Sequence, residues 1–255
     1  MNFTNEQNKT WRTLFARLRP VVEEHACSDY LAGFRNLKMD PERIPSVEEL
    51  NEQIAPRTGW KIERTKVRYS DAVPWYLKFS ERIFMITDYM RTWEELDFTP
   101  EPDMFHDIFG HLPFMTLKQY TAIQDMFAPA FIRATLEEQE NIKRLAWFST
   151  EFGLIKENGE VKIFGAGIMS SKGEIENVVS GKVPILPFTI ENVLKRNKAI
   201  YSFNKELFIF NSVEELKQEL GKYFDPIAAR EKIIIQRKEK IVDRELKDLK
   251  RPIFP

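Results

Sequence analysis

The stretch FTPEPDMFHDIFGHLPF, from Phe98 to Phe114, holds two of the chain's three histidines, His106 and His111. Asp103 is a suitable N-cap, so the segment MFHDIFG is predicted to form a short helix, which Gly110 would end. On a continuous α-helix, residues five apart lie about 140° apart, too far for both to bind one metal ion. The predicted helix end lets the second ring turn round. The two histidines are therefore candidate ligands of one metal ion.

A third ligand is needed, because HxxxxH spacing alone fits packing or capping histidines at least as well. A buried carboxylate costs free energy unless it is paired or binds a cation. Glu151 lies between two phenylalanines in the apolar segment LAWFSTEFGLI. Two imidazoles and one carboxylate form the facial triad that binds iron(II) and leaves positions open for oxygen chemistry. Zinc hydrolases also use histidine and glutamate, although the HExxH spacing typical of them is absent from this stretch.

The composition narrows the class of protein. The chain has 255 residues, of which 43% are hydrophobic and 30% charged, as expected for one large globular domain. Its 38 basic and 39 acidic side chains are balanced, so we predict a small-molecule ligand and no nucleic-acid partner. The single cysteine, Cys27, and the polar N-terminus MNFTNEQNKTW favour a cytoplasmic protein. No apolar run is long enough for a membrane span, and we predict a monomer.

Helical periodicity dominates the sequence, which predicts an α+β, mostly helical fold with a small sheet. Ser46 with Glu49, and Ser212 with Glu215, have the spacing of capping boxes. Helices are predicted over 6–24, from 46, from near 71 through the segment VPWYLKFSERIF, and over 117–136, 137 to about 156, 213–222 and 226–249. Strands are predicted over 60–64, 161–167, 183–186 and 206–210.

Three linked motifs, FTPEPDMFHDIFGH, STEFGLI and FGAGIMSSKGEI, resemble the motif series of the pterin-dependent aromatic amino acid hydroxylases. The similarity runs from about Trp75 to about Leu216, and the EPD-x-FHD-x-FGH form is most similar to the bacterial phenylalanine 4-monooxygenases. The resemblance implies a monooxygenase that uses iron(II), a tetrahydropterin and molecular oxygen to hydroxylate an aromatic amino acid, phenylalanine first. It implies one catalytic domain with a helical part at about 1–60, an iron- and pterin-binding core at about 61–225 and a C-terminal helix at about 226–255.

The resemblance also implies roles for single residues. His106, His111 and Glu151 match the iron ligands of the family. Arg91, in DYMRTWEE, matches the arginine that holds the substrate carboxylate, for which a guanidinium group is suited. The alternative for Arg91 is a surface arginine paired with a glutamate of the same segment.

Trp75 matches the aromatic residue that stacks on the pterin, with an ordinary core position as the alternative. Asp107 is a second pterin contact by the same resemblance. The substrate pocket implied by the family consists of Thr99, Pro102, Trp147, Phe152, Gly167 and Ser170. Each apolar member of this pocket could equally belong to the core.

The pattern GxGxxS that starts at Gly165 follows a predicted strand, as dinucleotide-binding loops do. Ser170 replaces the third glycine and no βαβ pattern surrounds it, so we reject that interpretation. The chain departs from the family in two places: Ala146 stands where a tyrosine usually precedes the tryptophan, and VRYSDAVPW lacks the glycine- and leucine-rich pterin loop. A tryptophan hydroxylase, a hydroxylase of another aromatic acid, and a non-catalytic aromatic-acid-binding protein of the same fold remain alternatives.

Overall fold

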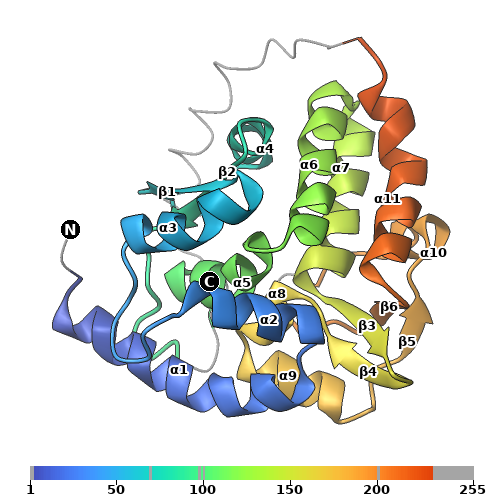
Figure 1. Cartoon of the computed structure of the whole chain (residues 1–255). Coiled ribbons are helices and arrows are strands. Elements are labelled where there is room, and N and C mark those ends of the chain that lie inside the picture. Colours follow the sequence, from blue (N-terminus) through green and yellow to red (C-terminus); the bar gives the residue numbers. More distant parts are fainter. Residues whose placement is uncertain (1–2, 69–70, 97–98, 100, 200–201, 232–255) are drawn as a thin grey trace, which may run out of the picture.

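The computed structural model describes residues 3–68, 71–96, 99, 101–199 and 202–231. Figure 1 shows a mostly helical chain with two small sheets. The α-helices are α1 (Asn5–His25), α2 (Ser28–Leu37), α3 (Val47–Thr58), α4 (Ala72–Ser80), α5 (Leu112–Met115), α6 (Lys118–Arg133), α7 (Leu136–Ala146), α8 (Ala166–Met169), α9 (Lys172–Val179), α10 (Ile190–Leu194) and α11 (Val213–Ala228). Two further segments are π-helical: η1 (His106–His111) and η2 (Trp147–Glu151). The predicted mostly helical α+β fold is confirmed.

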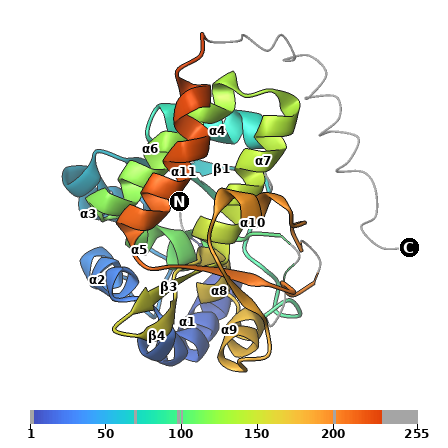
Figure 2. The same cartoon turned by 90° about the vertical axis from the view of Figure 1, so that its right-hand side faces the viewer.

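The strands form two sheets. Their bounds are β1 (Lys61–Thr65), β2 (Ile83–Thr87), β3 (Gly153–Glu157), β4 (Glu160–Ile163), β5 (Ile185–Pro187) and β6 (Leu207–Phe210). Strands β1 and β2 pair in parallel, and the second sheet has the order β4-β3-β6-β5, with only the β3–β4 pair antiparallel. In both Figure 1 and Figure 2, helices α6, α7 and α11 stand side by side above this second sheet. No helix among the described residues is long and apolar enough to cross a membrane.

Helix α1 buries one apolar face in the core of the protein. Five of its apolar residues lie on one helix face and are buried in the core: Trp11, Leu14, Phe15, Leu18 and Val22. The Trp11 ring meets the ring of Phe105, just before η1, with centroids 5.3 Å apart. Burying a large apolar side chain contributes about 1.5–3 kcal/mol. The N-terminal helix is therefore part of the same core as the metal-site segment.

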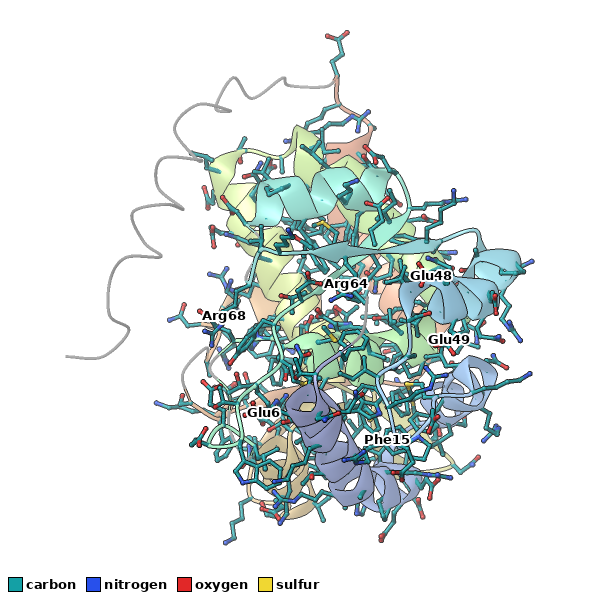
Figure 3. The ribbon with its side chains drawn as sticks, turned by 90° about the vertical axis from the view of Figure 1, so that its left-hand side faces the viewer. Glu6, Phe15, Glu48, Glu49, Arg64 and Arg68 are labelled. Carbon is teal, nitrogen blue, oxygen red and sulfur yellow. The ribbon has the colours of Figure 1, made fainter. Side chains whose placement is uncertain are left out.

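One capping box forms completely and the other only by half. The Ser46 hydroxyl accepts a hydrogen bond from the Glu49 amide, and the Glu49 carboxylate accepts one from the Ser46 amide. This capping box lies at the N-terminus of α3, where Figure 3 labels Glu49. The Ser212 hydroxyl likewise accepts from the Glu215 amide. The Glu215 carboxylate, however, accepts from Asn211 instead of Ser212. The prediction for α3 is confirmed, and that for α11 holds for its serine alone.

Several predicted boundaries are wrong. The helix from near 71 ends at Ser80, because Arg82 has a φ of 56° and the chain then enters β2, whose five residues are all buried. The helix predicted to reach about 156 ends with η2, and residues 153–157 form β3. Residues 166 and 167, predicted as strand, begin α8, and α2 was not predicted at all.

Helix α11 runs without a break from Val213 to Ala228, so it crosses the gap predicted between residues 222 and 226 and contains Pro226. Its face made of Leu216, Leu220, Phe224 and Ile227 is buried. A proline inside a helix costs about 3 kcal/mol, and burial of this apolar face against neighbouring elements offsets that cost. The helix predicted over 226–249 lies mostly outside the described residues.

The contact between α2 and α5 depends on Gly33. A Cβ atom at this position would overlap the backbone carbonyl of Pro113, which lies two residues after His111. We expect Gly33→Ala to lower the free energy of unfolding by about 1–3 kcal/mol, the usual effect of overpacking. Urea unfolding measures it, with the exposed Arg35→Ala on the same helix as a control that stays within about 0.5 kcal/mol. An unchanged midpoint for Gly33→Ala would show that the two helices can separate freely.

Candidate active site

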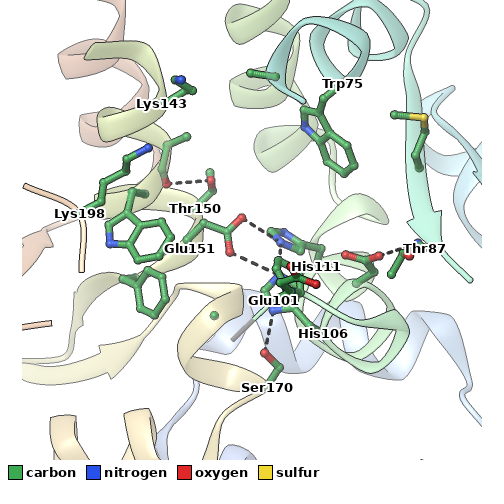
Figure 4. A pocket seen from close by; sticks show the side chains of 18 of the residues that line it. Trp75, Thr87, Glu101, His106, His111, Lys143, Thr150, Glu151, Ser170 and Lys198 are labelled. Atoms are coloured by element: carbon green, nitrogen blue, oxygen red, sulfur yellow. Dashed lines mark hydrogen bonds and ion pairs between the residues drawn. The ribbon is translucent and has the colours of Figure 1, made fainter. Parts of the chain in front are cut away.

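All twelve predicted site residues line one cavity of about 340 Å³, shown from close by in Figure 4. Helix α4 and strand β2 form one wall, the chain leading into η1 a second, and η2 with α8 a third. A cavity of this size suits a small-molecule ligand. Its residues come from segments up to about a hundred positions apart, and the fold therefore builds the site.

The π-helical segment η1 brings the two histidines together. The helix begins at Met104, where the Asp103 carboxylate accepts a hydrogen bond from the His106 amide at 3.0 Å, and it continues through α5 to Met115. The predicted helix end at Gly110 is therefore wrong. In a π-helix, hydrogen bonds join residues five apart, so His106 and His111 lie on one side with their Nε2 atoms 3.1 Å apart.

Gly110 does not end the helix, and its role is instead to allow a close contact with α8. A Cβ atom there would lie 2.7 Å from the backbone oxygen of Ala166 in α8. Glycine thus lets η1 and α8 approach closely. Because Ser170 follows α8, this close approach also places its hydroxyl against the His106 ring.

Glu151 completes the group from the last position of η2. Its Oε1 lies 3.1 Å from His111 Nε2, and its Oε2 lies 3.5 Å from His106 Nε2. The three ligand atoms all lie within 4.8 Å of one another. Two imidazole nitrogens that face each other repel through their lone pairs unless a proton or a cation lies between them. This donor set fits iron(II), which two histidines and one carboxylate bind on one face.

Ser170 fixes the orientation of the His106 ring. Its hydroxyl donates to the backbone oxygen of Ala166 at 3.0 Å, and the same oxygen lies 2.8 Å from His106 Nδ1. Since a hydroxyl has a single proton, Nδ1 must be the donor in the second contact. The neutral His106 ring then carries no proton on Nε2, the atom that faces Glu151. A metal ligand held in this way has its tautomer set in advance.

The charges of the site favour metal binding. Burial lowers the pKa of His106 to about 4, so this ring is neutral near pH 7. Burial alone would raise the pKa of Glu151, but the neighbouring histidines, His111 first, lower it to about 2. For His111 burial lowers the pKa, but the charge and the hydrogen bond of Glu151, together with the charge of Asp107, raise the pKa overall. The site therefore offers an ionised carboxylate beside an unprotonated imidazole.

Arg91 lies buried beside the metal-ligand candidates. Its Nε and Nη2 donate to the two carboxylate oxygens of Asp103 at 2.8 and 2.9 Å, and its amide donates to the same residue at 3.0 Å. The side chain is 4% exposed and that of Asp103 is 0% exposed. The alternative of a surface arginine paired with a nearby glutamate is therefore wrong. Three of the five guanidinium N–H groups remain for a ligand.

Aromatic rings form the wall beside Glu151. The Trp147 and Phe152 rings lie 4.5 Å apart, and a Cβ atom on Gly167 would lie 2.7 Å from the Phe152 ring. The Trp147 Nε1 donates to the side-chain oxygen of Asn204 at 2.9 Å. The polar edge of the indole is thus satisfied, and its apolar face is free to contact a ligand.

The opposite wall carries the residues predicted to contact a pterin. Trp75 is half-buried against Phe84, with ring centroids 5.1 Å apart, and lines the cavity across from Glu151 (Figure 4). It therefore belongs both to the edge of the core and to the cavity. The Asp107 carboxylate accepts a hydrogen bond from the Thr87 amide at 2.8 Å, and burial raises its pKa to about 7.

The last two predicted residues lie where the chain approaches η1. The Thr99 hydroxyl donates to the backbone oxygen of Glu101 at 3.0 Å, and both Thr99 and Pro102 line the cavity.

Five charged residues of the cavity were not singled out from the sequence: Arg68, Glu101, Lys143, Glu174 and Lys198. Arg68 and Glu101 form an ion pair with each other. Lys143 precedes Trp147 by four residues, so helical spacing from Trp147 could have found it. Glu174 and Lys198 have no local signal, because only the tertiary fold brings them to the cavity. Burial raises the pKa of Glu174 to about 7.

Two imidazoles and a carboxylate at an aromatic-lined cavity are typical of a class of proteins, the mononuclear non-haem iron oxygenases. The sequence model of the biopterin-dependent aromatic amino acid hydroxylases matches residues 1–244. The chain belongs to this family. Family membership decides against the metal-hydrolase alternative, and the protein is an aromatic amino acid monooxygenase.

Relatives of known name support the same conclusion. A phenylalanine-4-hydroxylase of Mesorhizobium japonicum is 34% identical over 235 residues, which are 91% of this chain and 85% of the relative. A tyrosine 3-monooxygenase of Schistosoma mansoni is 31% identical over 88% of this chain and 49% of the relative. The structure of Chromobacterium violaceum phenylalanine hydroxylase with bound iron(III) and 7,8-dihydrobiopterin has a TM-score of 0.81 and 29% identity, covering 91% of this chain and 85% of that one.

Proposed function

We propose that the protein hydroxylates phenylalanine to tyrosine, using iron(II), a tetrahydropterin and molecular oxygen. The observation that carries the proposal is one cavity in which a His–His–Glu group faces an aromatic wall and a buried arginine. The relatives named above include enzymes for two substrates, so the choice of phenylalanine is our inference. It is supported by the bacterial phenylalanine hydroxylases among them.

In this mechanism His106, His111 and Glu151 would hold the iron. Iron(II) and the reduced pterin together supply the activation of oxygen that ring hydroxylation requires. The protein contributes position and environment. Ser170 holds the His106 ring through Nδ1, and the apolar walls exclude water from the reacting ring.

The substrate would be held at both ends. The free N–H groups of Arg91 bind the carboxylate, and Thr99 lies nearby on the same wall of the cavity. The phenyl ring lies against Trp147 and Phe152, with Pro102 and Gly167 completing the pocket. These contacts would determine which ring carbon faces the iron, because the aromatic wall holds the ring while Arg91 holds the carboxylate at the other end of the substrate.

The pterin would stack on Trp75 beside Asp107. Stacking contributes on the order of 1 kcal/mol beyond the buried area. We expect Trp75→Ala to raise the KM for tetrahydropterin about fivefold and to change the KM for phenylalanine less. Steady-state rates measure both constants, and Leu77→Ala, an exposed residue on the same helix, is the matched control. Equal changes in the two KM values would show that Trp75 has a structural role and does not contact the pterin specifically.

Product analysis tests the proposed reaction. The iron-loaded protein is incubated with tetrahydropterin and with phenylalanine, tyrosine or tryptophan, and oxygen uptake and products are followed. Tyrosine formed from phenylalanine, in step with pterin oxidation, is the expected result. Hydroxylation of tryptophan alone would change the substrate, and amino acid binding without pterin oxidation would favour a binding protein.

The setting of the enzyme is also a proposal. Iron(II) and reduced pterin persist in a reducing compartment, and the only cysteine, Cys27, is buried, so we propose a cytoplasmic enzyme. We further propose that it acts as a monomer. Its single catalytic domain would consist of a helical part up to about residue 60, an iron- and pterin-binding core up to about residue 225 and a C-terminal helix. Light scattering of the full chain measures the molar mass in solution. A mass twice the 30.1 kDa of one chain would refute the monomer.

A further inference from the structure

Two lysines line the cavity on the side away from Trp75. Figure 4 shows Lys143 and Lys198 on one side of Thr150 and Glu151, with Trp75 on the other. Lys143 lies on α7, two turns before Glu151. Lys198 follows α10, so the two side chains converge from separate elements. Neither lysine has a role in the function proposed above.

The charges around the two lysines are unbalanced. Lys143 pairs with Glu140, one turn earlier on the same helix. Lys198 has no ion pair or hydrogen bond with any residue that the structure describes. Arg144 adds a third positive charge, and its Nη1 donates to a neutral partner, Asn141, at 2.8 Å. Among the residues that the structure describes, Glu140 is the only carboxylate paired with any of these three cations, and it pairs with Lys143.

The excess of positive charge destabilises the charged form of Lys198. Burial first, and the charges of Lys143 and Arg144 after it, lower the pKa of Lys198, and the negative charge of Glu140 only partly opposes them. An ammonium group without a partner in a partly buried position is stabilised when an anion binds beside it. The carboxylate of Glu174 lines the same cavity, but the structure gives it hydrogen-bond contact with Asn204 and no ion pair with either lysine.

Space is present beside the lysines. Ala146 and Ala199 line this part of the cavity, and each offers only a methyl group. Arg91, which the proposed function assigns to the carboxylate of the amino acid, is bound to Asp103 on the chain that leads into η1. The lysines are therefore a second positive region, separate from that arginine.

We propose that Lys143 and Lys198 form a subsite for an anionic group, of the carboxylate type, carried by a ligand of this cavity in addition to the carboxylate held by Arg91. The inference rests on the proposed function, because that function supplies the two ligands that can carry the group. These are the pterin, through an acidic substituent at its 6-position, and the aromatic amino acid, through an acidic ring substituent. The shared chemistry is one carboxylate between two ammonium groups.

Equilibrium binding to the iron-loaded protein under anaerobic conditions tests the subsite without turnover, because the reaction requires oxygen. One pair of probes is pterin-6-carboxylate and 6-methylpterin, and the other is 4-carboxyphenylalanine and 4-methylphenylalanine. Calorimetry gives a Kd for each. We expect the carboxylate member of one pair to bind about fivefold or more tightly than its neutral partner, as one partly exposed ion pair allows. The pair that shows the preference identifies which ligand carries the group.

Variants assign the preference to the lysines. In the double variant Lys143→Gln/Lys198→Gln the carboxylate probe should lose its advantage, while the neutral probe keeps its Kd within about twofold. Lys198→Arg, which retains the charge, should keep the preference. Lys195→Gln is the matched control, since Lys195 is exposed, pairs with Glu191 and lies three residues before Lys198. Circular dichroism checks that each variant is folded.

Three results would overturn the subsite. The first is equal affinity within both probe pairs. The second is a preference that survives in the folded double variant. The third is a loss of unsubstituted phenylalanine binding in the double variant as large as the loss of the carboxylate probe, since the lysines would then hold the ordinary amino acid carboxylate. Failure to hydroxylate phenylalanine would count against the proposed function alone, because these binding constants do not depend on turnover.

Discussion

Replacement of His106, His111 or Glu151 by alanine is expected to abolish hydroxylation and to leave a folded protein. Each residue supplies one of three atoms that lie within 4.8 Å of one another. Loss of a residue that only supports a metal ligand typically costs 10–100-fold in affinity or activity, so loss of a ligand itself should leave less than about one hundredth of the rate. Metal analysis after anaerobic loading and pterin-dependent oxygen uptake measure iron content and rate.

The third histidine is the natural control for this series. His25 lies at the end of α1, outside the cavity, and its nearest acidic partner is the exposed Glu24. His25→Ala should keep iron and full activity. Glu151→Gln separates charge from shape, since the amide fills the same space but cannot balance the metal charge. One iron per chain with near-normal rates in any variant of the three residues would refute the assignment of the ligands.

The histidine pair shows what the sequence could predict and what it could not. The motif and the buried acidic segment identified His106, His111 and Glu151. The predicted helix end at Gly110 was wrong, because η1 achieves the same convergence by widening the helix. No local preference distinguishes a π-helical turn from an α-helical one, since its extra residue is accommodated by neighbouring elements, here α8 against Gly110.

The missed strands have a related cause. The segment IFMIT of β2 is buried along its whole length and follows a helix after two residues, so its apolar run has no period that separates strand from helix. Strand β3 follows the π-helical segment η2 after one residue, Phe152, and the first three residues of the strand are also buried. Alternation of polar and apolar residues requires one solvent-exposed face, and these strands lack it in the part that was misassigned.

Charge pairing was the hardest feature to predict. The partner of Arg91 is Asp103, twelve residues away, and neither the pairing nor the burial of both groups has a local signal. The two lysines of the cavity come together only in the tertiary fold, which brings α7 and the segment after α10 to the same cavity. Motifs identified the residues that a family shares. The features particular to this chain depend on the tertiary fold.

Arg91→Lys is expected to weaken the use of the amino acid tenfold or more, which is about 1.4 kcal/mol. The guanidinium group binds Asp103 through Nε and Nη2 and still has three N–H groups for a carboxylate. A lysine has one nitrogen and cannot bridge both carboxylates with the same planar geometry. The contact exists before and during the reaction, so the KM for phenylalanine should rise more than kcat falls.

Two measurements separate this carboxylate contact from a structural effect. Asp103 also accepts a hydrogen bond from the His106 amide, so a general disturbance of the Arg91–Asp103 pair would reach the metal ligands and lower the iron content. Iron content should instead stay unchanged in Arg91→Lys. Arg82→Lys is the matched control, because Arg82 makes the same two-point contact with Asp125 on the surface, away from the cavity. If Arg91→Lys has wild-type constants for every aromatic amino acid, another residue must hold the carboxylate, and the two cavity lysines would be the first to examine.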